Sequence, residues 1–147
     1  MAASAYTLYN RARKKLVNGT FDLDTNVFRC KLFKGQAAAS VSVSTLSLLS
    51  QIGTTNAVAN VSAYTLSGIA LTALNGSATM KWDANDLVIT ATGGNAASIQ
   101  YAVIYNSLSA GGGHVLGWCK LSTAAFTVTS GNTLTITQPA NGLFVIY

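Results

Sequence analysis

Ser98-Ile-Gln-Tyr-Ala-Val-Ile-Tyr-Asn106 is the stretch that decides the fold of this chain. Apolar and β-favouring residues fill both faces of it: Ile99, Tyr101, Val103 and Tyr105 on one, Ala102 and Ile104 on the other. A strand wetted on one side alternates apolar with polar residues, and this stretch barely does. We therefore expect a central strand covered on both faces. The run 115–121 has the same character, follows a glycine-rich loop at 109–114, and predicts an antiparallel partner.

The length and composition predict a single domain spanning residues 1–147, with an unusually uncharged surface. Of the 147 residues, 50% are hydrophobic and only 9% are charged, against roughly 25% charged in an ordinary soluble domain. Serine, threonine, alanine, glycine and asparagine fill the surface positions instead. A surface with so little charge gives little repulsion between copies of the protein. We therefore expect the protein to self-associate as a dimer or trimer.

The positive charge is concentrated near the N-terminus. The formal net charge is +5, and seven of the nine basic residues lie in the first 34 positions: Arg11, Arg13, Lys14, Lys15, Arg29, Lys31 and Lys34. A basic patch attracts an acidic partner, which is either nucleic acid or an acidic protein surface. A solvated helix face without any partner explains the same pattern, and this alternative stays open.

Residues 5–16 predict an amphipathic helix within an N-terminal basic segment, 1–19. Ser4 is expected to cap this helix and Gly19 to end it. One face carries apolar residues at helical spacing: Ala5, Leu8, Tyr9, Ala12 and Leu16. The basic residues Arg11, Lys14 and Lys15 point away from that face.

Residues 27–33 alternate with period two and predict a strand wetted on one side. Phe28, Cys30 and Leu32 would face the core, with two basic residues facing outward. The predicted partner-binding site is therefore a basic patch made by the outer helix face and the outer strand face: Arg11, Lys14, Lys15, Arg29 and Lys31.

Short strands and tight turns are predicted for most of the remaining chain. Residues 35–43 predict a loop, and 45–52 a short helix closed by Gly53. Strands are expected at 64–73 (broken or bulged at Gly68), 79–82, 87–92, 126–129, 134–137 and 143–147. Asn75-Gly76 signals one hairpin turn, and the strands at 126–129 and 134–137 another hairpin. This pattern predicts a mainly β fold: an antiparallel β-sandwich or jelly roll with one short N-terminal α-helix.

The sequence predicts neither an enzyme nor a cofactor or metal site. His114 is the only histidine, and there is no Gly-x-Ser-x-Gly nucleophile elbow. Gly111-Gly-Gly113 lacks the lysine and the following helix of a phosphate-binding loop. Aspartate favours turns through side-chain-to-backbone hydrogen bonds, although it also offers oxygens to a hard cation. The four acids all fall in predicted turns: Asp22, Asp24, Asp83 and Asp86.

The two cysteines are expected to be buried free thiols. Cys30 and Cys119 lie in predicted strands and lack the spacing of a zinc site. Free thiols suit a reducing cytoplasm. No apolar stretch approaches the roughly 20 residues of a membrane span, and the N-terminus lacks the apolar core of a signal peptide. We therefore expect no membrane partner.

The order of several short motifs resembles that of a widespread group of small tailed-bacteriophage virion proteins. The motifs are Tyr64-Thr-Leu-Ser-Gly68, Trp82-Asp-Ala-Asn-Asp-Leu87, Tyr101-Ala-Val-Ile-Tyr-Asn106 and Val115-Leu-Gly-Trp118, after a helix and a basic strand and before a terminal apolar strand. That group often shows an Asp-Ala-Asp-Asp turn, then a Tyr-Ala-Val-Ile-Tyr strand and a Leu-Leu-Gly-Tyr strand. Asn85 stands here where the group often has aspartate. The resemblance implies a structural protein carried in the virion and assembled in the host cytoplasm.

The resemblance favours a capsid decoration (cement) protein. Its partner would be the major capsid protein or another virion protein, contacted through the basic patch. The main alternative is a tail or fibre component that recognises a host-surface glycan through its glycine- and asparagine-rich loops. The third interpretation, a nucleic-acid-binding protein, depends on the charge alone and is the weakest of the three.

Overall fold

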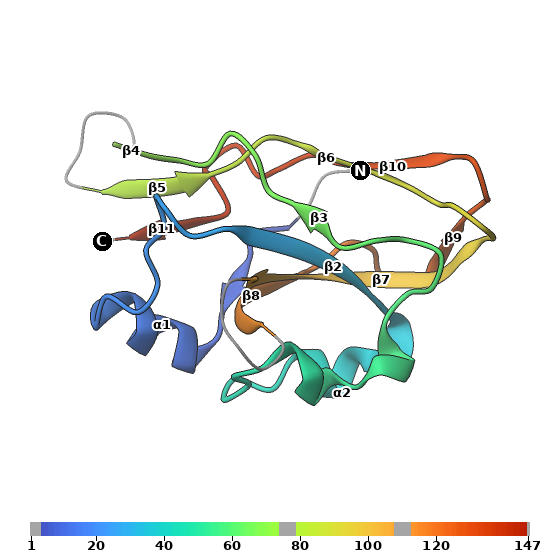
Figure 1. Cartoon of the computed structure of the whole chain (residues 1–147), viewed down its shortest axis with the longest axis horizontal. Helices are drawn as coiled ribbons and strands as arrows, with labels where there is room; N and C mark the ends of the chain where they lie inside the picture. Colours follow the sequence, from blue (N-terminus) through green and yellow to red (C-terminus); the bar gives the residue numbers. More distant parts are fainter. Residues whose placement is uncertain (1–3, 74–78, 108–112, 147) are drawn as a thin grey trace.

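The computed structural model describes residues 4–73, 79–107 and 113–146, and most of its elements are antiparallel β-strands (Figure 1). Strand β7 (Ala96–Asn106) lies inside the largest sheet, between β2 (Phe28–Lys34) and β8 (His114–Lys120). From Tyr101 onward every residue of β7 is buried. The prediction of a central strand covered on both faces is confirmed, as is its antiparallel pairing with the following strand.

The largest sheet has six strands. Their order is β1-β8-β7-β2-β3, with the short strands β1 (Thr7–Leu8) and β3 (Tyr64–Thr65) at the two edges. Strand β9 (Phe126–Val128) pairs with the first residues of β7. The sheet therefore joins segments from the N-terminal part of the chain with segments from its middle and its C-terminal half.

Two smaller antiparallel sheets lie on one side of the large sheet (Figure 1). One contains β4 (Ala70–Ala73), β5 (Met80–Asp83) and β11 (Phe144–Ile146) in the order β11-β5-β4. The other pairs β6 (Leu87–Thr90) with β10 (Thr133–Ile136). This layering is consistent with the predicted β-sandwich, and the jelly-roll connectivity stays a prediction.

Trp82 joins the two layers. Its side chain is fully buried on β5, and its ring meets the Phe28 ring of β2 edge-on, with the ring centroids 5.1 Å apart. The Phe144 ring of β11 lies at the same distance on another side. The indole Nε1 donates a hydrogen bond of 3.2 Å to the Leu23 carbonyl, which satisfies the one polar group of this side chain.

Helical segments cover the other side of the large sheet (Figure 1). They are α1 (Asn10–Val17), η1 (Gly35–Ala37), α2 (Ala38–Val41), η2 (Leu49–Ile52) and η3 (Thr54–Asn56). The predicted loop at 35–43 is therefore wrong. Its alanine-rich sequence favours helix, and Ala37 and Val41 are both buried. The predicted helix at 45–52 is reduced to the single turn η2.

The N-terminal helix was predicted to start too early. Thr7 and Leu8 pair with Trp118 and Gly117 as strand β1, because the edge of β8 is available for main-chain hydrogen bonds. Only at Asn10 does helix α1 begin, and the Ser4 hydroxyl donates to the Lys120 carbonyl instead of capping a helix. Sequence periodicity did not reveal this pairing, since the partner strand is distant in sequence.

The predicted break at Gly68 is confirmed. Gly68 has a φ of +60°, in the left-handed region that favours glycine. The chain changes sheet there, because β3 pairs with β2 whereas β4 pairs with β5. The hairpin predicted for 126–129 and 134–137 is wrong for a related reason: β9 pairs with β7 and β10 with β6, so the intervening turn also connects different sheets. The Asn75-Gly76 turn, most of the loop at 109–114 and Tyr147 lie outside the described residues.

Candidate docking surface around helix α1

Helix α1 gathers three of the five predicted basic-patch residues around one open cavity. The cavity has a volume of ≈230 Å³ and is lined by Arg11, Lys14, Lys15, Asn18, Thr20 and Ser47. The three basic residues share a helix face, because side chains three and four positions apart are neighbours on a helix. Two of them, Lys14 and Lys15, stand in the last helical turn, where cations also suit the helix dipole. The three residues therefore lie together as the sequence predicts, and their role in partner binding stays a prediction.

Neighbouring side chains order the basic cavity. The Lys15 ammonium lies 5.7 Å from the centroid of the Phe21 ring, within cation–π range. Asn18 Oδ1 accepts hydrogen bonds from the Thr20 hydroxyl at 2.7 Å and from the Thr20 amide at 3.1 Å. None of the described acidic residues lines the cavity. Three cationic groups without a lining carboxylate make this a favourable place for the carboxylates of a partner.

A larger, mainly apolar groove lies beside α1. Its volume is ≈1030 Å³, and it is lined by Leu8, Arg13, Leu16, Val17, Gly19, Phe21, Asp22, Leu23, Leu71 and Val145. Val17 and Leu71 are 90% and 41% exposed, which is unusual for large apolar side chains. Exposed apolar patches of this kind mark interaction sites. We refer to this feature as the apolar groove.

Helix α1 therefore contributes to two surfaces of different chemistry. Arg11, Lys14 and Lys15 line the basic cavity, whereas Arg13 and Val17 line the apolar groove. The groove was not predicted from the sequence, because Leu8, Leu71 and Val145 come from distant segments in two different sheets and meet only in the folded chain. Val17, two residues after the basic run and outside the expected apolar face, was its one local signal.

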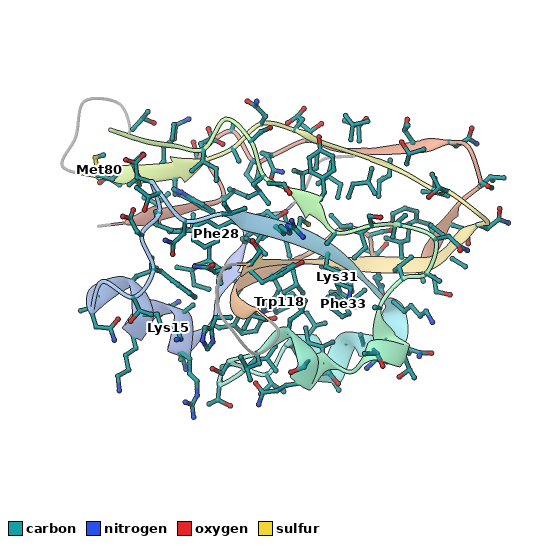
Figure 2. All side chains as sticks on the ribbon, in the orientation of Figure 1. Lys15, Phe28, Lys31, Phe33, Met80 and Trp118 are labelled. Carbon is teal, nitrogen blue, oxygen red and sulfur yellow. The ribbon has the colours of Figure 1, made fainter. Side chains whose placement is uncertain are left out.

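The two remaining basic-patch residues lie elsewhere. Arg29 and Lys31 project from β2 and line neither the basic cavity nor the apolar groove. Figure 2 shows Lys31 over the middle of the large sheet, well separated from Lys15 on α1. Arg29 is exposed, whereas Lys31 is half-buried and Phe33 on the same strand face is buried, because the helical layer covers part of that face. The face of β2 that was predicted to be exposed to solvent is therefore only partly exposed.

Arg29 lies close to the Tyr105 phenol on the neighbouring strand. Burial raises the pKa of Tyr105, and the Arg29 guanidinium acts in the opposite direction through its charge and a hydrogen bond. This contact gives Arg29 a role within the large sheet. The basic patch is thus divided into a cluster on α1 and a separate pair on β2.

The acidic residues organise turns. Asp22 Oδ1 accepts the backbone amides of Asp24 at 2.9 Å and Thr25 at 3.1 Å, and hydrogen bonds from Thr25 and from these amides lower the pKa of Asp22. Asp83 forms an ion pair of 3.0 Å with Lys81. Asp86 accepts the backbone amide of residue 138 at 3.0 Å. Within the described parts of the chain, no three histidine, cysteine or acidic residues come together as a metal site.

The prediction of buried free thiols is confirmed. Cys30 and Cys119 are both buried and not joined in a disulfide. Burial raises the pKa of both thiols, to about 12 for Cys119. The neutral thiol is therefore the stable form, and neither sulfur is poised as a nucleophile. His114 lies with Nδ1 3.4 Å from the Ser47 carbonyl and its ring beside Phe21.

The two surfaces beside α1 combine positive charge with exposed apolar area. Among residues 4–73, 79–107 and 113–146, no helix combines the length and the apolar character needed to cross a membrane. Comparisons with protein-family models, curated proteins and solved structures found no match to this chain.

Proposed function

We propose that this chain is a structural protein of a tailed-phage particle, a capsid decoration protein that docks on the shell through the surface around α1. The observation that carries the proposal is the grouping of Arg11, Lys14 and Lys15 around one cavity, directly beside the apolar groove. Cations attract an acidic surface, and burial of apolar area adds affinity at the same place. The motif order described above supplies the phage context.

The distribution of charge supports different binding roles for the two ends of the molecule. Between Asp86 and the C-terminus, Lys120 is the only charged residue. Strands β9 and β10, which come from this part of the chain, lie toward the end of the molecule opposite α1 (Figure 1). This end carries few charges, Lys34 among them, since Lys34 pairs with Ile99, which in turn pairs with Phe126 of β9. Few charges suit contacts between copies of the protein, because their repulsion would be small. On this proposal, a dimer or trimer forms away from α1 and leaves α1 for the shell.

The apolar groove favours a protein partner over nucleic acid. Binding to nucleic acid relies on phosphate contacts and on aromatic platforms for the bases. The groove instead offers mainly aliphatic side chains, including Leu16, Val17 and Leu71. Many equivalent copies on a shell would also make weak single contacts sufficient, because simultaneous engagement raises the effective concentration.

The test is attachment to particles of the phage that encodes the chain, followed by imaging of its position. We expect the variant R11A/K14A/K15A to remain folded and to bind about 10-fold more weakly per site. Three exposed ion pairs at about 0.5 kcal/mol each amount to about 1.5 kcal/mol, which corresponds to that factor. The control variant K31A/K34A/K120A removes the same charge outside both the basic cavity and the apolar groove, and should attach normally.

Several outcomes would contradict the proposal. Equal weakening by both triple variants would show that only net charge matters. Submicromolar binding to duplex DNA, with a log–log salt slope near −4, would instead support a nucleic-acid-binding protein, since each neutralised phosphate contributes about −0.9. Density for the chain on the tail and not on the shell would favour a tail or fibre component.

A further inference from the structure

We infer that the apolar groove receives a short segment of the shell protein whose apolar side chains are flanked by aspartate or glutamate. This inference rests on the proposed function and specifies the partner chemistry of the same surface. The groove supplies apolar contacts through residues that include Leu16, Val17 and Leu71. Across the same helix, the basic cavity supplies three cationic groups. One segment of mixed apolar and acidic sequence matches both surfaces.

The charges at the groove itself agree with this occupant. Arg13 and Asp22 are its two charged lining residues. The Asp22 carboxylate is engaged within its own turn, where one oxygen accepts the amides of Asp24 and Thr25. The side-chain hydrogen bond from Thr25, together with these amides, lowers the pKa of Asp22, so the carboxylate would oppose a second carboxylate placed beside it. The acidic residues of the segment therefore belong on the α1 side, toward Arg13 and the basic cavity.

A second copy of the chain is a poor occupant of the groove. Two copies docked groove to groove would bring two α1 helices together. Each helix carries four cations and no acid: Arg11, Arg13, Lys14 and Lys15. Like charges placed opposite one another across an interface select against that pairing. Charge complementarity thus identifies an acidic partner and directs self-association to the less charged end of the molecule, away from α1.

Photo-crosslinking from position 17 tests the identity of the occupant. Val17 is 90% exposed at the groove, so a benzophenone side chain fits there without disturbing the core. Val43, which is 43% exposed and does not line the groove, is the matched control position. On particles, we expect position 17 to crosslink to a shell-protein segment with apolar residues flanked by acids. Crosslinks to a second copy, to DNA or to a basic segment would overturn the inference, as would equal yields from positions 17 and 43.

A pair of matched substitutions tests the groove separately from the docking as a whole. Leu71 and Val88 are strand residues of similar exposure, 41% and 47%, and only Leu71 lines the groove. We expect Leu71→Glu to weaken attachment to particles at least 10-fold and Val88→Glu to change it less than 2-fold. Equal attachment of the two variants would overturn the groove inference and leave the proposed function intact. Failure of the wild-type protein to attach to particles would overturn the proposed function, and the groove inference with it.

Discussion

Replacement of Trp82 by phenylalanine should measure how strongly the two layers are joined. The indole is fully buried, donates to the Leu23 carbonyl, and contacts Phe28 and Phe144 at ring distances of 5.1 Å. Phenylalanine keeps an aromatic ring there but loses the N–H donor. A buried carbonyl without its partner costs about 1–3 kcal/mol, and the smaller ring leaves a void that costs about 1 kcal/mol more.

We therefore expect Trp82→Phe to lower the free energy of unfolding by about 2–4 kcal/mol. With a urea m-value of about 2 kcal/mol/M, the unfolding midpoint should fall by about 1–2 M at an unchanged m-value. Trp118→Phe is the matched control, because Trp118 is half-buried and its ring packs against Tyr101 at a centroid distance of 6.0 Å. That control should cost less than about 1 kcal/mol.

Unfolding of each tryptophan variant can be followed by fluorescence, since each retains one tryptophan as a probe. Urea titrations followed by fluorescence and by circular dichroism should coincide for both proteins if unfolding is two-state. A cost below about 0.5 kcal/mol for Trp82→Phe, or equal costs for the two variants, would refute the view that Trp82 joins the layers.

Three further outcomes are expected. Gly142→Ala should lower the free energy of unfolding by about 2 kcal/mol or more, because φ is +80° and a Cβ there would lie 2.7 Å from the Trp82 carbonyl oxygen. Gly131 has a similar φ of +85° but open space around it, so Gly131→Ala should lower the free energy of unfolding by only about 1 kcal/mol. Urea denaturation measures both values. Thiol titration should find Cys30 and Cys119 unreactive in the native protein and both reactive after denaturation; fewer than two thiols under non-reducing conditions would contradict their free state. Burial raises the pKa of Cys119 from 9.0 to about 12, so the contribution of its neutral thiol to the free energy of unfolding is complete below pH 9 and is lost between pH 9 and 12. Cys119→Ala should therefore reduce the fall of the free energy of unfolding with alkaline pH by up to about 1.4 kcal/mol per pH unit. The same pH dependence in the variant and the wild type would contradict this origin.

Local patterns predicted the features that depend on neighbouring residues. Apolar residues on both faces identified β7 as a central strand, and period-two alternation placed Phe28 and Cys30 in the core. Gly68 was recognised as a break because its lack of a side chain permits positive φ. Each of these properties is encoded within a few residues, so sequence reasoning reaches it.

Features that depend on distant partners were not predicted. Thr7 and Leu8 have helical periodicity with the following residues, yet their pairing with β8 makes them a strand. The strands on either side of the 130–132 turn have hairpin character, yet they belong to different sheets. The apolar groove was missed for the same reason, because Val145 and Leu71 approach α1 only in the folded chain.

The pairing pattern also has a consequence for synthesis of the protein on the ribosome. Strand β2 leaves the ribosome long before its central partner β7, and β1 must wait for β8. The first half of the nascent chain therefore has a helix and apolar strands but few partners with which to complete the large sheet. Pairing between distant segments is slow, and unpaired strands are prone to aggregation in the meantime. Folding should be largely post-translational, so expression at lower temperature or with a chaperone that shields nascent strands should raise the soluble yield.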